Sequence, residues 1–281
     1  MTATADGHLS YGVDVQTRMG FFTDTSVCIG CKACEVACKE WNLVPEDGFV
    51  WTGQSLDNTG QLSASTWRHV AFVEKSVRNG DGFDQWLMSS DVCKHCTHAA
   101  CLDVCPTGAI FRTEFGTVVI QDDVCNGCGY CIPACPFGVI GRRERDQGVE
   151  HGPNAHDGGA HKCTLCYDRL QDGMEPACAK ACPTDSIQFG PLDELVDKAR
   201  ERCEHLVESG VESARLYGDD ENDGVGGFGA FFLLLDKPEV YGLPPAPVVT
   251  TRDLPSIWRT TLAAAGAVAG LVALAFVGSK S

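Results

Sequence analysis

The sequence predicts an α+β protein made of two nested cysteine-rich units with insertions, followed by one C-terminal transmembrane helix. All but one of the 17 cysteines fall into four quartets with short, recurring spacing. Segments of alternating polar and apolar residues, typical of strands, separate the quartets, and residues 262–278 carry no charge. The first to fourth quartets are Cys28, Cys31, Cys34 and Cys38; Cys93, Cys96, Cys101 and Cys105; Cys125, Cys128, Cys131 and Cys135; and Cys163, Cys166, Cys178 and Cys182.

The chain before residue 93 combines an arm, the first quartet and an insertion. Residues 1–22 are polar with scattered aromatic side chains, so we expect an extended arm along a neighbouring subunit or a disordered tail. They contain no apolar run, and we therefore expect no signal peptide. A short helix should continue from the first quartet through Trp41. In the insertion, alternation at 67–74 and 85–88 predicts strands, with turns at 79–82.

Residues 93–140 hold the second and third quartets. The third has the spacing C-x-x-C-x-x-C-x-x-x-C-P, which is typical of a loop that binds a [4Fe–4S] cluster and sends its fourth cysteine to a neighbouring cluster. The second differs only in having four residues between its second and third cysteines. Residues 107–122 read as a β-hairpin that joins the two quartets. Quartet, hairpin and quartet together predict a ferredoxin-like unit.

The fourth quartet follows a polar linker. Cys105, Cys135 and Cys182, each the last cysteine of its quartet, all begin a similar stretch (CPTGAI, CPFGVI and CPTDSI). This internal repetition indicates duplicated supersecondary units.

Residues 191–257 carry no quartet. Apolar positions at 191–210 predict a helix with Cys203 in its apolar stripe, where core packing is the expected role of this cysteine. Residues 224–229 formally match G-x-G-x-x-G. A nucleotide site needs a preceding strand and a following helix. Here an acidic loop precedes the motif and a strand-like run at 230–235 follows it, so we reject that interpretation.

The C-terminal segment predicts a membrane helix. The 17 uncharged residues 262–278 would span about 26 Å as a helix, the lower limit for crossing a bilayer. Trp258 fits an interfacial anchor, and Gly266 and Gly270 provide a small-residue face. The alternative is a buried helix of a soluble protein.

These features divide the chain into five parts. They are the arm, first quartet and insertion (1–92), the inner two-cluster unit (93–140), the linker and fourth quartet (141–190), the helix, acidic loop, strand and connector (191–257), and the transmembrane helix and tail (258–281).

The cysteine pattern favours iron–sulfur clusters over other uses of cysteine. Disulfide frameworks do not repeat the x-x spacing. Zinc sites use two pairs of cysteines, whereas here three closely spaced cysteines are joined by a distant fourth. Because the hairpin joins the second and third quartets, these two should exchange Cys105 and Cys135; by elimination the outer two should exchange Cys38 and Cys182.

The sequence therefore predicts four [4Fe–4S] clusters, with Cys203 left over. The predicted ligand sets are Cys28, Cys31, Cys34 and Cys182; Cys93, Cys96, Cys101 and Cys135; Cys125, Cys128, Cys131 and Cys105; and Cys163, Cys166, Cys178 and Cys38. Four such clusters in a small protein form a path for electrons. No catalytic residue is predicted.

The charged residues argue against a nucleic-acid partner and suggest how the reduction potentials of the clusters could be adjusted. The net charge of −16 argues against nucleic acid, because phosphate binding needs clustered Lys and Arg. Four lysines lie within one residue of a predicted ligand, and we hypothesise that they raise the reduction potentials of nearby clusters. They are Lys32, Lys39, Lys94 and Lys162.

Stretches inside and outside the quartets are similar to one family. They are residues 28–42 (CIGCKACEVACKEWN), 65–70 (STWRHV), 162–169 (KCTLCYDR) and 236–244 (DKPEVYGLP). With the order of the quartets and the single C-terminal helix, they resemble the β (iron–sulfur) subunit of membrane-bound molybdenum or tungsten formate dehydrogenase, over nearly the whole chain.

The resemblance implies that the chain transfers electrons and is not itself an enzyme. In that family the subunit carries electrons from a large molybdopterin α subunit to a membrane cytochrome b γ subunit. It is exported with the α subunit, which bears the twin-arginine signal, so the iron–sulfur body is expected on the outer face of the cell membrane.

Two alternatives remain open. The quartets alone fit the equivalent subunit of a dimethyl sulfoxide, nitrate or polysulfide reductase, or of a membrane hydrogenase. A structural zinc-binding scaffold is a different class of protein and predicts no reducible EPR signals.

Overall fold

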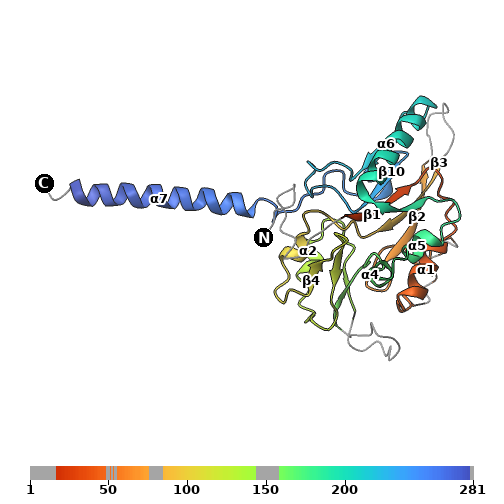
Figure 1. Cartoon of the computed structure of the whole chain (residues 1–281), viewed down its shortest axis with the longest axis horizontal. Coiled ribbons are helices and arrows are strands. Elements are labelled where there is room, and N and C mark those ends of the chain that lie inside the picture. The colour runs from red at the N-terminus through yellow and green to blue at the C-terminus, as the bar shows by residue number, and fades with distance from the viewer. Residues whose placement is uncertain are drawn as a thin grey trace.

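The computed structural model describes residues 17–48, 51, 53, 56–75, 85–143 and 158–278. A mixed α+β body carries all the cysteines, and one long helix, α7 (Leu254–Gly278), projects away from it (Figure 1). The turns predicted at 79–82 and most of the predicted arm, residues 1–16, lie outside the described residues.

A four-stranded sheet corrects the prediction for the end of the arm. Its strand order is β8 (Ile187–Pro191), β1 (Met19–Asp24), β10 (Ala230–Leu234), β9 (Arg215–Tyr217). β1 is parallel to β10, and the other neighbouring strands are antiparallel. Phe21 and Phe22 are buried because β1 is a central strand, so residues 19–22 belong to the core and not to an arm.

The helix and strand predicted beyond the fourth quartet are confirmed. Helix α6 (Leu192–Glu208) packs on β1 and β8, and the predicted 230–235 run is β10. Leu195 and Ala199 are buried, while Cys203 is half-buried against the core, as its place in the apolar stripe predicts. Gly210 follows the helix with φ 97°, a conformation that favours glycine.

The strands predicted in the insertion and in the inner hairpin are also confirmed. β2 (Arg68–Lys75) pairs with β3 (Gln85–Val92), and β4 (Ile110–Arg112) pairs with β5 (Val118–Ile120), both antiparallel. A short pair, β6 (Gly141–Arg142) and β7 (Ala160–His161), leads towards the fourth quartet. These strands hold the cysteine loops against the body.

Short helices bring the quartets together in pairs. Helix α1 (Ala33–Trp41), which contains the end of the first quartet and reaches Trp41 as predicted, packs against α5 (Ala177–Lys180) in the fourth. Helix α2 (Ala100–Asp103) in the second quartet packs against α3 (Cys131–Ala134) in the third. Helix α4 (Tyr167–Gln171) and the 3-10 turn η1 (Pro238–Tyr241) complete the described elements.

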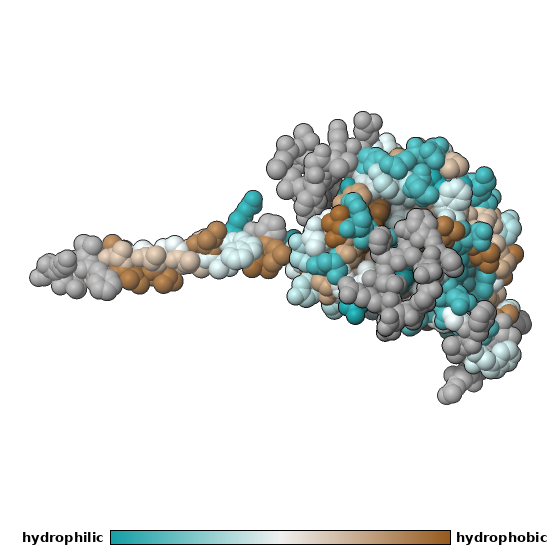
Figure 2. All heavy atoms as spheres, turned by 90° about the horizontal axis from the view of Figure 1, so that it is seen from below, coloured by the Kyte–Doolittle hydropathy of each residue, from teal (hydrophilic) through white to brown (hydrophobic). Residues whose placement is uncertain are grey.

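Helix α7 has the composition of a membrane span. Residues 256–275 are long and apolar enough to cross a bilayer, and none of this segment is buried in the chain. Figure 2 shows apolar side chains along the projecting helix. Leu262 and Leu271 are more than two-thirds exposed. A helix of this kind in a soluble monomer would expose a large apolar surface to water, so its exposure in this chain fits membrane anchoring better than burial in a soluble core.

Candidate metal centres

Four groups of sulfur atoms occupy the body. Two of them line cavities whose volumes, counted together with their open mouths, are about 300 Å³ and 360 Å³. In the other two, neighbouring thiolates raise the pKa of Cys38 and of Cys131 in addition to the larger effect of burial. We name them group A (Cys28, Cys31, Cys34, Cys182), group B (Cys38, Cys163, Cys166, Cys178), group C (Cys93, Cys96, Cys101, Cys135) and group D (Cys105, Cys125, Cys128, Cys131). Each group contains three cysteines of one quartet and one of another, in the sets into which the sequence divides them.

The cysteine loops bend through left-handed backbone conformations. Lys32 (φ 60°), Cys166 (φ 48°) and His95 (φ 45°) adopt them beside groups A, B and C. In group D the position is Gly127 (φ 71°), where an added Cβ would lie 2.1 Å from the carbonyl oxygen of Gly158. These bends allow several sulfurs and backbone N–H groups to face one point.

Hydrogen-bond donors approach the sulfurs of the outer groups. The hydroxyl of Ser90 lies 3.2 Å from Sγ of Cys34 in group A. In group B the backbone N–H of Leu165 donates to Sγ of Cys163 at 3.3 Å. Donors of this kind stabilise anionic sulfur, whether thiolate or cluster-bound.

The inner groups have similar surroundings. In group D the backbone N–H of Ala160 donates to Sγ of Cys125 at 3.5 Å. In group C burial raises the pKa of Cys135, while the backbone N–H groups of Val139 and Phe137 oppose that rise. Sulfur atoms of both inner groups thus accept hydrogen bonds from backbone N–H groups.

Several buried thiols in these groups are costly to ionise without a cation. Burial raises the pKa of Cys34 to about 11, although the charge of Arg68 opposes the rise. Burial also raises the pKa of Cys131 to about 11, and Cys125 adds to the effect. Bound iron would supply the missing positive charge, since a coordinating thiol is deprotonated.

The geometry fits clusters better than single ions. Within the described parts of the chain, no three Cys, His, Asp or Glu side chains converge as ligands of one metal ion would. Zinc needs four ligands at about 2.3 Å from a single centre. Around a [4Fe–4S] cluster each cysteine binds a different iron, so the sulfurs stand apart around a cavity. Thiols that line a cavity and face N–H donors therefore fit [4Fe–4S] clusters.

The groups also influence one another's pKa values. Apart from burial, which is the main cause, Cys178 of group B raises the pKa of Cys34 in group A. Cys93 of group C does the same to Cys163 in group B. Burial raises the pKa of Cys101 in group C to about 12, and Cys131 of group D contributes. Neighbouring charges thus link A to B, B to C and C to D.

Two of the four groups reach the surface. Cys31 in group A and Cys128 in group D are exposed. All four cysteines of group B are buried, and those of group C are buried or half-buried. An electron could therefore leave or enter most directly at groups A and D.

The four lysines named from the sequence have different surroundings. Lys94 is fully buried, with its ammonium paired to Asp91, and Lys162 is buried and donates to the carbonyl of Cys163. The remaining two are partly exposed and pair with carboxylates: Lys32 with Glu35 and Asp57, and Lys39 with Asp47. Carboxylates next to three of the four reduce the net charge that a cluster would sense.

Three residues near the sulfurs were not singled out by the sequence. Arg68 and Ser90 lie side by side on β2 and β3, and Nδ2 of Asn42 lies 3.8 Å from Sγ of both Cys38 and Cys166. A charged residue at the start of an apolar strand was a signal for Arg68. No local signal marked Ser90, which lies 56 residues from Cys34, or the contact of Asn42 with Cys166, which spans 124 residues.

The glycine-rich segment that resembled a nucleotide motif packs against the second quartet. The backbone N–H groups of Thr97 and His98 donate to the carbonyls of Gly227 and Val225 at 3.1 and 2.8 Å. An added Cβ at Gly226 would lie 2.3 Å from the ring of His98. These glycines thus support the loop of group C.

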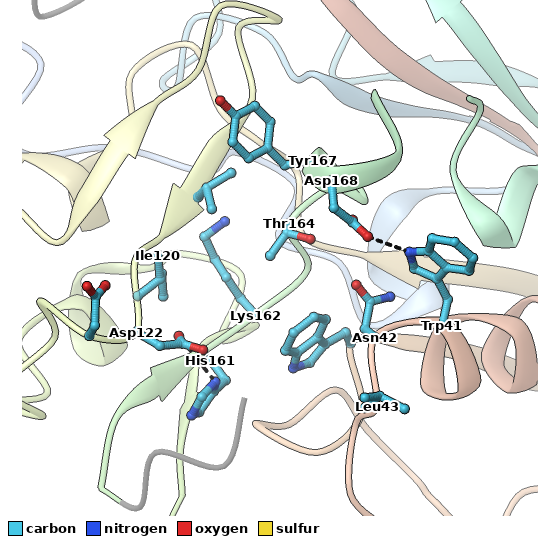
Figure 3. A pocket seen from close by; sticks show the side chains of 13 residues that line it. Trp41, Asn42, Leu43, Ile120, Asp122, His161, Lys162, Thr164, Tyr167 and Asp168 are labelled. Atoms are coloured by element: carbon cyan, nitrogen blue, oxygen red, sulfur yellow. Dashed lines mark hydrogen bonds and ion pairs between the residues drawn. The ribbon is translucent and has the colours of Figure 1, made fainter. Parts of the chain in front are cut away.

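An open cavity of about 1200 Å³, mouth included, lies beside the sulfur groups (Figure 3). No cysteine lines it. Trp41 at the end of α1 donates through Nε1 to Asp168 on α4 at 2.7 Å, and Nδ1 of His161 lies 3.7 Å from Asp122. Two of its carboxylates are therefore engaged with neighbouring side chains.

Comparisons with known proteins show what the chain is similar to. Two family models, each described as a 4Fe-4S dicluster domain, match residues 27–109 and 84–192. The iron-sulfur subunit of nitrate-inducible formate dehydrogenase from Escherichia coli (strain K12) is 39% identical over 270 residues, covering 94% of this chain and 85% of the relative. The formate dehydrogenase iron-sulfur subunit of Haemophilus influenzae is 40% identical over 269 residues, covering 94% and 80%. The B subunit of anaerobic dimethyl sulfoxide reductase from Escherichia coli is 37% identical over 185 residues, covering 65% and 78%.

Proposed function

Because the chain belongs to the family of formate dehydrogenase iron–sulfur subunits, we propose that it carries electrons through four [4Fe–4S] clusters from a molybdopterin (Mo or W) catalytic subunit to a membrane cytochrome b or quinone. Groups A to D would each hold one cluster, which supplies one-electron chemistry. Two ferredoxin-like units would then be nested, the inner one holding C and D and the outer one A and B. Cys203, half-buried on α6, is no ligand in this proposal.

The electrostatic links between the groups support a row in the order A, B, C and D with one exposed cysteine at each end, and this arrangement carries the proposal. A subunit that only stored electrons would not need two surface-exposed ends, whereas a subunit that passes electrons between two partners does. Cys31 and Cys128 mark the two places where a partner could approach.

The position of α7 suggests which end faces the membrane. Just before α7, the hydroxyl of Thr251 donates to Asp103 on α2 at 2.6 Å, and α2 leads directly to Cys105 of group D. Figure 1 shows α7 leaving the body near α2. We therefore place group D towards the membrane cytochrome and group A towards the catalytic subunit. The body would lie on the outer face of the cell membrane, exported with its catalytic partner.

A similar subunit of another molybdopterin reductase is the second candidate, because the dimethyl sulfoxide reductase subunit is also a relative. That match covers 65% of the chain, whereas the formate dehydrogenase relatives match 94% of it. The wider match favours a formate dehydrogenase subunit over a dimethyl sulfoxide reductase subunit.

Purification of the membrane complex in detergent tests the proposal. We expect roughly sixteen irons per chain, four per cluster, reducible EPR signals, a pterin-containing partner by mass spectrometry, and reduction of a dye by formate. Four clusters without formate activity would favour the second candidate. A zinc protein with no visible absorption would contradict both.

A further inference from the structure

Arg68 is a buried cation at the start of β2. Its side chain is among the largest that are fully buried, with 1% of the residue exposed. The guanidinium carbon lies 4.9 Å from the centre of the Phe21 ring, so one face of the guanidinium is covered by an aromatic side chain of the central strand β1. Burial of an arginine requires compensation for several kcal/mol of lost hydration.

The hydrogen bonds of Arg68 compensate only part of that loss. Nη1 donates to the hydroxyl of Ser90 at 3.0 Å and to its carbonyl oxygen at 3.3 Å. Among the residues that the structure describes, Nε and Nη2 have no hydrogen-bond partner, and none of the ion pairs includes Arg68. The N–H groups at Nε and Nη2 are therefore buried donors that could bind an acceptor other than the described carboxylates.

The nearby negative charges come from both outer sulfur groups. Burial alone would lower the pKa of Arg68, but Cys178 and Cys163 of group B and Cys34 of group A raise it overall. Ser90 links Arg68 to group A, because its hydroxyl lies 3.2 Å from Sγ of Cys34 while it accepts from Arg68. The guanidinium thus has sulfurs of both groups as nearby negative charges and is joined to group A through Ser90.

We propose that Arg68 is the shared counter-charge of groups A and B, and that its Nε and Nη2 donate to sulfur atoms of the clusters held there. This inference rests on the proposed function. A fixed positive charge stabilises the more negative, reduced form of each cluster, so Arg68 raises the reduction potentials at A and B together. Lysine cannot replace it fully, because an ammonium lacks the planar fork that reaches two acceptors at once.

Three variants in the purified complex separate charge from shape. Arg68→Gln removes the charge and keeps a planar, hydrogen-bonding group. Arg68→Lys keeps the charge. Arg200→Gln is the control, since Arg200 lies on α6, half exposed, with carboxylates 3.9 Å away. Iron content and EPR-monitored redox titration are the readouts, with the signals assigned by Cys31→Ser for group A and Cys128→Ser for group D.

We expect Arg68→Gln to lower the reduction equilibrium constant of the clusters at A and B at least tenfold, which is 59 mV for a one-electron couple. The clusters at C and D should keep their potentials. Arg68→Lys should shift A and B by less than half as much, and Arg200→Gln should shift none. Equal shifts in the Gln and Lys variants, or no shift with all four clusters assembled, would overturn the proposal.

If Arg68→Gln fails to assemble the outer clusters, Ser90→Ala provides the second test. It removes the anchor of the guanidinium while leaving the charge and the fold of β3, and should lower the potentials at A and B together without reducing the iron content. Loss of the contact between Ser90 and Cys34 alone would shift only the potential at A. An unchanged potential at B in that variant would also overturn the proposal. A wild-type complex without reducible clusters would contradict the proposed function instead, so the two failures are distinguishable.

Discussion

The hydroxyl of Thr107 lies 3.7 Å from Sγ of Cys105. The same relationship recurs in the fourth quartet, where the Thr184 hydroxyl lies 3.8 Å from Sγ of Cys182. Both threonines occupy the Cys-Pro-Thr repeat, and their cysteines belong to the end groups D and A. In the third quartet the equivalent residue is Phe137, which has no hydroxyl.

Removing these hydroxyls should lower the potentials of the end clusters selectively. A hydrogen bond contributes about 0.5–1.5 kcal/mol, which at 59 mV per tenfold change corresponds to roughly 20–60 mV. We expect Thr107→Val to lower only the potential at group D and Thr184→Val only that at group A, measured by redox titration. Each variant is the control for the other. A shift of the same cluster by both would contradict the placement of the two cysteines.

The exchange of last cysteines between quartets can be tested at Cys135. This cysteine lies in the third quartet but lines the cavity of group C with Cys93 and Cys96. Cys135→Ser should therefore alter or remove the EPR signal of the group C cluster first, whereas Cys131→Ser should affect group D. If Cys135→Ser instead removes the signal that Cys131→Ser removes, the nested pairing is wrong.

Much of this arrangement is predictable from the sequence because it depends on local spacing. Three-residue steps between cysteines identify the quartets, and polar–apolar alternation identifies β2 and β3. The apolar stripe that contains Leu195 and Ala199 is sufficient to place α6.

The features that were missed depend on pairing between distant segments. Residues 19–22 look like the end of a polar arm, yet β1 is central because it pairs in parallel with β10. The Thr25 hydroxyl, for example, donates to the carbonyl of Leu233, 208 residues away. Arg68 could be placed on a strand from its neighbours. Its burial against Phe21 of β1 joins segments far apart in the sequence, which local patterns do not encode.

Gly127 is the position where the loop of group D should tolerate least change. A Cβ there would meet the Gly158 carbonyl at 2.1 Å, and its φ of 71° also disfavours other residues. We expect Gly127→Ala to displace the loop and to lose the group D cluster, about four irons per chain. Iron analysis and EPR would measure this.

Gly138→Ala is the matched control for this clash. Gly138 has a similar φ of 63°, but nothing lies within 4 Å of an added Cβ. That variant should keep its iron and lose only about 1–2 kcal/mol of stability from backbone strain. Equal iron loss in both variants would show that the positive φ, and not the contact with Gly158, holds the loop.

A charge in the middle of α7 should weaken attachment to the membrane. Val268 lies near the centre of the 256–275 span and is 61% exposed in the isolated chain. An arginine at the centre of a transmembrane helix costs about 2.5–3.5 kcal/mol on insertion scales. Val268→Arg should therefore release a larger fraction of the subunit from washed membranes. Val248→Arg, an equally exposed position before the helix, should leave attachment unchanged. Because the sulfur groups lie in the body, Val268→Arg should keep the iron content. A loss of iron together with a loss of attachment would mean that α7 is needed to assemble the body as well as to anchor it.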